Sequence, residues 1–140
     1  MRKDDAMTMM ELLEGLAQAA GMTDGIRPEE DGSVCLAVDD FAVAFREIAD
    51  GQELLMWSPL AERPPEIADR LNELLLRANF LGALTGGSVL SLSEGGERIC
   101  LHRRLALAGL DAEAFRKAFE DFVEAALVWR REIGDAVDRA

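Results

Sequence analysis

The order in which helix-like and strand-like patterns follow one another most constrains the fold of this chain. Three segments carry apolar residues at helical spacing, and five shorter segments between them have the alternation or apolar content of β-strands. The predicted order is α-β-β-β-α-β-β-α. Successive strands joined by short turns pair antiparallel, so we expect an α+β fold in which three helices accompany a twisted antiparallel sheet.

The first helix has a defined start and end. Thr8 to Glu11 reads as a capping box, in which the side chains of both residues satisfy backbone amides at the helix start. Gly21 follows the last apolar residue, and glycine readily adopts the left-handed conformation that ends helices. The apolar stripe between them consists of Met9, Leu12, Leu13, Leu16, Ala17 and Ala20. The composition of residues 22–32 predicts a loop.

The next three segments predict an antiparallel meander. Residues 34–38 and 41–45 alternate, and Asp50-Gly51 is a strong hairpin signal before a third strand at 53–60. This third strand is apolar on both faces, which predicts a central strand covered on each side. The first strand is then expected at an edge of the sheet.

The second helix is predicted to begin at Pro64-Pro65, because proline at the first helical position sacrifices no hydrogen bond. It carries one apolar stripe for its own sheet, formed by Ile67, Leu71, Leu74, Leu75 and Ala78. A second stripe on another face consists of Leu76, Phe80 and Leu84. Two apolar faces need two packing surfaces, and we expect the second surface to be another copy of the chain.

Two further strands are predicted at 89–92 and 99–105, followed by a helix that Asp111 caps and that ends near Gly134. No linker or repeat divides the chain. The prediction is therefore one domain over residues 1–140, with an ordered core at about 8–134.

The charge balance excludes several classes of partner. There are 27 acidic and 15 basic residues, a formal net charge of −12. Such a surface repels nucleic acid and anionic membranes. The N-terminal residues do not form a signal peptide and no apolar run can span a bilayer, so we expect a cytoplasmic protein. Cys35 and Cys100 are expected to be buried, reduced thiols.

No catalytic or metal-binding pattern is present in the sequence. His102 is the single histidine, and no nucleophile signature accompanies it. The pairs Gly86-Gly87 and Gly95-Gly96 match no phosphate-binding loop and indicate turns. We therefore expect no enzymatic activity, no cofactor and no metal.

The pattern resembles the class I type III secretion chaperones, the Tir-chaperone-like family of Gram-negative bacteria. The resemblance runs from about Met9 to Ile133. It rests on the opening Leu12-Leu13-x-x-Leu16 helix with Gly21, the strand Val34 to Asp39, the segment Leu71-x-x-Leu74-Leu75-x-x-x-Asn79, the strand Ile99-Cys100-Leu101, and the closing helix from Leu110-Asp111 through Phe119, Phe122 and Trp129.

The resemblance implies a cytoplasmic homodimer that binds the N-terminal segment of a secreted effector in extended form and keeps it soluble. It implies a dimer interface built by the second helix and the following strand, with candidates Leu76, Phe80, Leu84, Val89, Leu90 and Leu92. It implies an effector groove at the first helix and the first strands, with candidates Leu12, Leu16, Val34, Leu36 and Val38.

Two alternatives stay open at the level of sequence. One is an adaptor of the same fold that is unrelated to secretion, and the other is a small-ligand-binding α/β domain. For Leu12 and Leu16 taken singly, core packing is the commoner role of such residues.

Overall fold

The computed structural model describes residues 7–21, 26, 28–38 and 40–139, with the side chains of Val38 and Phe41 left out. The predicted order of elements is confirmed. Short 3₁₀ turns, Pro65–Ile67 and Phe80–Gly82, lie before and after the second α-helix. The elements are α1 (Met9–Ala19), β1 (Val34–Val38), β2 (Phe41–Ile48), β3 (Glu53–Glu62), α2 (Ala68–Ala78), β4 (Val89–Leu92), β5 (Arg98–Ala106) and α3 (Ala112–Asp138).

The five strands form one antiparallel sheet in the order β1-β2-β3-β5-β4. The predictions of a central third strand and an edge position for the first strand are both confirmed. β4 forms the opposite edge. A bulge between Pro59 and Ala61 shifts the register of β3 against β5, so Glu62 lies opposite Arg98 at the far end of that pair.

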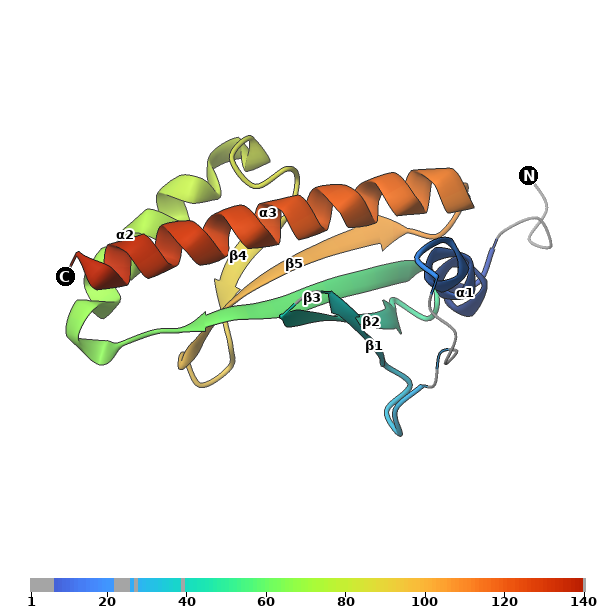
Figure 1. The fold of residues 1–140 in the computed structure, drawn as a ribbon, viewed down its shortest axis with the longest axis horizontal. Coiled ribbons are helices and arrows are strands. Elements are labelled where there is room, and N and C mark those ends of the chain that lie inside the picture. Colours follow the sequence, from blue (N-terminus) through green and yellow to red (C-terminus); the bar gives the residue numbers. More distant parts are fainter. Residues whose placement is uncertain (1–6, 22–25, 27, 39, 140) are drawn as a thin grey trace.

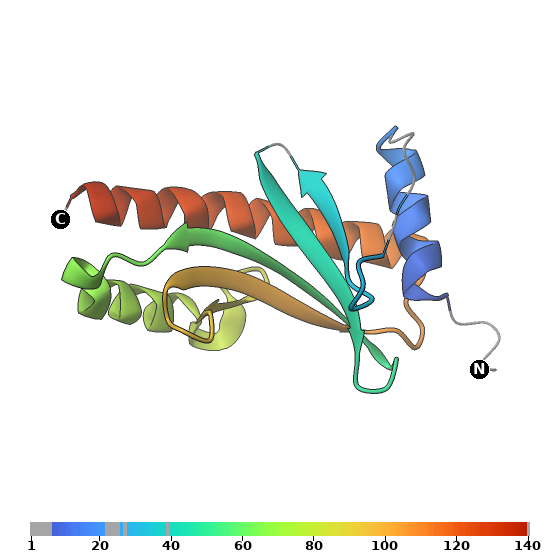
Figure 2. The same ribbon diagram turned by 90° about the horizontal axis from the view of Figure 1, so that it is seen from below.

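The three helices lie on one side of the sheet (Figure 1). α3 extends over β3, α2 lies beside β4, and α1 lies near the N-terminal end of α3. None of the described helices lies over the opposite face of the sheet when it is seen from below (Figure 2). We call it the outer face. The expectation that β3 is covered on each side was wrong for the single chain, because all three helices pack on the same side.

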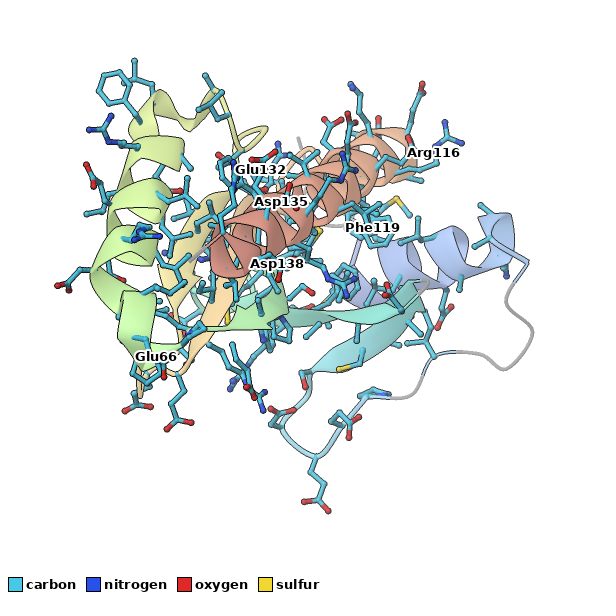
Figure 3. The ribbon with its side chains drawn as sticks, turned by 60° about the vertical axis from the view of Figure 1, so that its left-hand side comes forward. Glu66, Arg116, Phe119, Glu132, Asp135 and Asp138 are labelled. Atoms are coloured by element: carbon cyan, nitrogen blue, oxygen red, sulfur yellow. The ribbon has the colours of Figure 1, made fainter. Side chains whose placement is uncertain are left out.

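The core forms between the helices and the inner face of the sheet. Phe45 of β2 is fully buried, and its ring centroid lies 6.1 Å from that of Phe115 and 5.9 Å from that of Phe119, both of α3. Figure 3 shows Phe119 among the side chains of α3. Burying side chains of this size contributes roughly 1.5–3 kcal/mol each, so these rings are a large part of what holds α3 to the sheet.

Local signals predict the starts of α1 and α3 well, whereas α2 begins at Ala68, after a 3₁₀ turn at Pro65–Ile67, rather than at Pro64-Pro65 as predicted. The hydroxyl of Thr8 accepts a hydrogen bond from the amide of Glu11 at 3.1 Å, and the carboxylate of Glu11 accepts one from the amide of Thr8 at 3.0 Å. The carboxylate of Asp111 likewise accepts from the amide of Ala114 at 2.8 Å. These contacts depend only on residues three positions apart, which is why sequence reveals them.

Two helix ends differ from the prediction. α3 continues past Gly134 to Asp138, because Ile133 is fully buried and Ala136 and Val137 still pack against the core. α2 ends at Ala78, and Leu81 adopts a positive φ of 59° just beyond it. Phe80 and Leu84 therefore lie after the helix rather than on one continuous helical face.

The prediction for the cysteines was wrong for Cys35. The register of β1 turns Val34 and Leu36 toward the core, so Cys35 between them is exposed. Cys100 of β5 is half-buried on the outer face, and burial raises the pKa of its thiol, with Arg98 opposing that effect. Both thiols are reduced.

Candidate interaction surfaces

A cluster of exposed apolar side chains lies at α2 and the turn that follows it. Leu76 is 73% exposed, Phe80 70%, Leu81 85% and Leu84 64%. We call these four residues the α2 patch. An apolar surface of this kind on a soluble protein marks a site of contact with another chain. Leu81 was missed by helical spacing, because it joins the patch only through the break after Ala78.

The strand after the α2 patch contributes less than predicted. Val89 is 42% and Leu92 37% exposed, but Leu90 is only 3% exposed and belongs to the core. The side chain of Asn79 donates to the carbonyl of Leu90 and accepts from its amide, both at 2.8 Å. This pair of bonds fixes β4 against the end of α2, so Leu90 is not available to a second copy.

The predicted groove at α1 and β1 also needs correction. Leu12 and Val34 are 1% exposed and Leu36 is 5% exposed, so all three are core residues of the single chain. The side chain of Val38 lies outside the described residues. Leu16 is half-exposed and lines an open groove of about 480 Å³ between α1 and the start of α3. Phe115 and Arg116 line its other wall, and Figure 3 shows Arg116 on α3.

β1 has one free edge in the described part of the sheet. β1 pairs with β2 along Val34–Val38 and with no other described strand. Its remaining backbone groups are therefore available for pairing with an added strand. Because the side chains of Val34 and Leu36 are buried, β1 offers its backbone and the exposed Cys35 and Ala37 rather than these two predicted residues.

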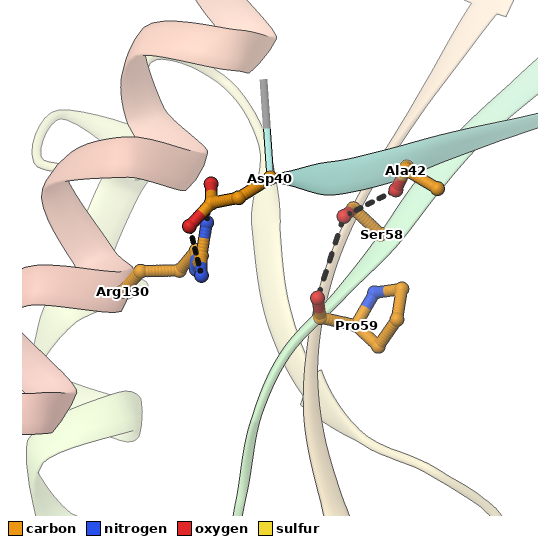
Figure 4. Close-up of polar contacts among 5 residues, drawn as sticks. All are labelled: Asp40, Ala42, Ser58, Pro59 and Arg130. Atoms are coloured by element: carbon orange, nitrogen blue, oxygen red, sulfur yellow. Dashed lines mark hydrogen bonds and ion pairs between the residues drawn. The ribbon is translucent and has the colours of Figure 1, made fainter. Parts of the chain in front are cut away.

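An ion pair ties the β1–β2 turn to α3. Both terminal nitrogens of Arg130 donate to the carboxylate of Asp40, at 2.8 and 3.3 Å (Figure 4). The hydrogen bond and charge of Arg130 lower the pKa of Asp40. In the same region the buried hydroxyl of Ser58 donates to the carbonyl of Ala42 at 2.7 Å (Figure 4). These bonds hold the turn of the edge hairpin in place.

The outer face carries a depression of about 530 Å³ over β3, β4 and β5. Leu55 and Trp57 form its floor, and both are half-buried. His102 lies next to Trp57, its Nδ1 3.4 Å from the hydroxyl of Ser91. Burial, with a smaller effect from Arg104, lowers the pKa of His102 and favours the neutral ring. The sequence pattern showed that β3 was apolar on both faces, but not that one face is left open.

Acidic side chains gather elsewhere. Glu132, Asp135 and Asp138 lie along the C-terminal half of α3 (Figure 3). Within the described residues, no three histidine, cysteine, aspartate or glutamate side chains are arranged to hold a metal ion. None of the described helices has the length and apolar character to cross a bilayer.

Comparison with protein families gives a match over most of the chain. The model of the Tir chaperone protein (CesT) family matches residues 11–130, which run from the first turn of α1 into the second half of α3. Among curated proteins, none matches the chain significantly.

Several solved structures share the fold. The crystal structure of the ExsC-ExsE complex matches with a TM-score of 0.68 and 18% identity, over 89% of this chain and 96% of that one. The Yersinia pestis type III secretion chaperone SycH, in complex with a fragment of YscM2, matches with a TM-score of 0.62 and 20% identity, over 86% and 98%. The HopA1-SchA chaperone-effector complex matches with a TM-score of 0.69 and 19% identity, over 86% and 91%.

Proposed function

Because the chain belongs to the Tir chaperone protein family, we propose that it is an effector-binding chaperone of type III secretion. It holds the N-terminal segment of a secreted effector in extended form, in the cytoplasm, and keeps that effector soluble and competent for secretion. The observation that carries the proposal is the family match over residues 11–130, because it includes every strand of the sheet and most of each helix.

The free edge of β1 gives this function a physical basis. An extended segment that pairs with Val34–Val38 gains main-chain hydrogen bonds without having to fold. The groove between α1 and α3, with Leu16 and Phe115 in its walls, is a second place that accepts apolar side chains of the effector. Each anchor that becomes well buried contributes roughly 1.5–3 kcal/mol before ordering costs are subtracted.

The α2 patch supports a homodimer. Four apolar side chains that are each more than half exposed are unfavourable in water and gain free energy when a second copy covers them. In a two-fold interface the same patch packs against itself, so every side chain contributes twice. Leu92 of β4 is also exposed, whereas the exposed Val89 lies opposite His102 on the outer face and so does not belong to the same surface.

The test is to capture the tagged full-length protein from the cells that express it and to weigh the intact complexes by native mass spectrometry. A dimer that carries one larger protein, released when the N-terminal segment of that protein is deleted, is the expected result. A bare monomer rejects the proposal. A bound protein whose export does not depend on a type III secretion system favours an adaptor unrelated to secretion.

A further inference from the structure

The outer-face depression differs in charge from the rest of the chain. The chain has 27 acidic and 15 basic residues. Yet among the described residues that line the depression none has a carboxylate, whereas the guanidinium of Arg104, the imidazole of His102 and the indole of Trp57 all lie on it. Hydroxyls of Ser91 and Ser93 are also in its wall. A site that is apolar in its floor and offers mainly N–H and O–H donors is complementary to an apolar group with a nearby anion.

The sheet register adds a second guanidinium. Leu55 pairs with Arg46 of β2 on one side and with Arg104 of β5 on the other. The two arginines therefore flank Leu55 at about 10 Å from one another, two strand spacings apart. Both side chains are exposed.

The carboxylate of Glu53 near this face is already engaged. Arg104 donates to Glu53 at 2.6 Å, with its side chain still 56% exposed, and that is its one hydrogen bond among the described residues. Because a guanidinium has five N–H donors, Arg104 retains donors for a second carboxylate. Arg98 is a further exposed arginine of β5, and it lies opposite Glu62 in the register.

We propose that the outer-face depression binds an acidic amphipathic segment of the effector. An apolar side chain of this segment lies on Trp57 and Leu55, and a carboxylate two to four residues away pairs with Arg104 or Arg46. The inference rests on the proposed function. It specifies which kind of effector segment binds at a second site, separate from the β1 edge. A second copy of the chain is a poor occupant, because an isologous contact here would bring the same arginines against one another.

The depression also reaches the β4 edge of the sheet. Leu92 of the edge strand β4 lines it, and β4 lies against α2 on the other side of the sheet. A segment that leaves the depression across β4 therefore reaches the neighbourhood of the α2 patch.

Three short labelled peptides test the proposal with the full-length protein. They share the same leucines and differ only at their polar positions, which are all Glu, all Gln or all Lys. Anisotropy titrations give their affinities. The net charge of −12 alone attracts the Lys peptide and repels the Glu peptide. We expect the reverse order, with the Glu peptide bound most tightly.

The variant Arg104→Gln should weaken the Glu peptide about five-fold, as for one partly desolvated charge pair, and leave the Gln peptide unchanged. Arg131→Gln is the matched control, because Arg131 is exposed on α3 and its substitution changes the net charge of the protein by the same amount. The chain has two tryptophans, so two indole N–H signals report the location by NMR. Trp57 should shift on binding. Trp129, which donates to the carbonyl of Leu84 at 2.9 Å, should not.

Tighter binding of the Lys peptide, equal loss in both variants, an unmoved Trp57 signal, or no saturable binding of the Glu peptide would each overturn the inference. If an effector captured from cells binds Arg104→Gln as it binds the parent protein, the inference fails while the proposed function stands. If no effector associates with the parent protein, the proposed function itself fails.

Discussion

Removing the ring of Phe80 should weaken the dimer while leaving the fold of each chain intact. Phe80 is 70% exposed in the single chain, directly after α2. Its ring therefore contributes little to the core of its own chain. In a dimer formed through the α2 patch, the same ring becomes buried against the second copy, so Phe80→Ala acts on association rather than on folding.

The exposed fraction gives the size of the effect. Fully burying a phenylalanine side chain contributes up to about 3 kcal/mol. With 70% of the side chain available for burial, the loss is about 2 kcal/mol for each copy. A two-fold interface loses the ring twice, about 4 kcal/mol in total. Because about 1.4 kcal/mol corresponds to a factor of ten, the dissociation constant should rise roughly a thousand-fold.

Sedimentation over a series of protein concentrations measures this constant. Leu127→Ala is the control, because it also truncates an apolar side chain on a helix surface, but on α3 and from a residue that is 37% exposed. The control should keep the parent dissociation constant. Circular dichroism and urea unfolding below the dissociation constant should show that Phe80→Ala changes the stability of the monomer by less than about 0.5 kcal/mol.

An undisturbed dimer in Phe80→Ala would refute the interface. A parent protein that stays monomeric at high concentration would refute the dimer itself. A Phe80→Ala chain that fails to fold would show that the ring packs within its own chain, against the exposure seen here.

Three other results are expected. Asp40→Asn should lower the urea midpoint at about pH 7, and the difference between this variant and the parent protein should vanish as the pH falls. The reason is that the pKa of Asp40 is lower in the folded than in the unfolded protein. The ionised carboxylate therefore contributes its full stability above about pH 3.9, and this contribution is lost as the pH falls through the folded pKa. A difference that persists in acid would contradict this. Iodoacetamide should alkylate the exposed Cys35 well before Cys100, because partial burial raises the pKa of the Cys100 thiol. A bound effector that pairs with β1 should protect Cys35. Peptide mass mapping measures both alkylation rates, and equal rates would contradict the prediction. Asn79→Ala should cost about 1–3 kcal/mol of unfolding free energy, because it leaves the amide and carbonyl of Leu90 without their partner; a variant as stable as the parent in urea would exclude that role.

Residues close together in the chain were interpreted reliably. The capping contacts of Thr8 and Asp111 form within one helical turn, and the alternation from residue 34 to residue 38 correctly predicts a strand there. The edge position of β1 follows from the short connections of a meander. The apolar surplus of Leu76, Phe80 and Leu84 was also visible, since three strongly apolar residues outside the main stripe have no place in a single core.

Which individual residues are exposed could not be predicted from short-range sequence patterns. Leu90 and Val89 are neighbours with similar side chains, yet Leu90 is buried and Val89 is 42% exposed, because successive strand residues face opposite sides of the sheet and the helices cover only one side. Leu12, Val34 and Leu36 looked like groove residues, but the packing of α1 and the inner face of the sheet buries them.

The sequence by itself determined the elements, their order and the presence of more apolar surface than one chain can bury, because these depend on short-range periodicity. The tertiary structure decided where that surface lies. The end of α2 at Ala78 and the packing of all three helices on one side of the sheet depend on contacts between distant segments. Those contacts leave the α2 patch and the face around Trp57 open, and no local pattern carries that information.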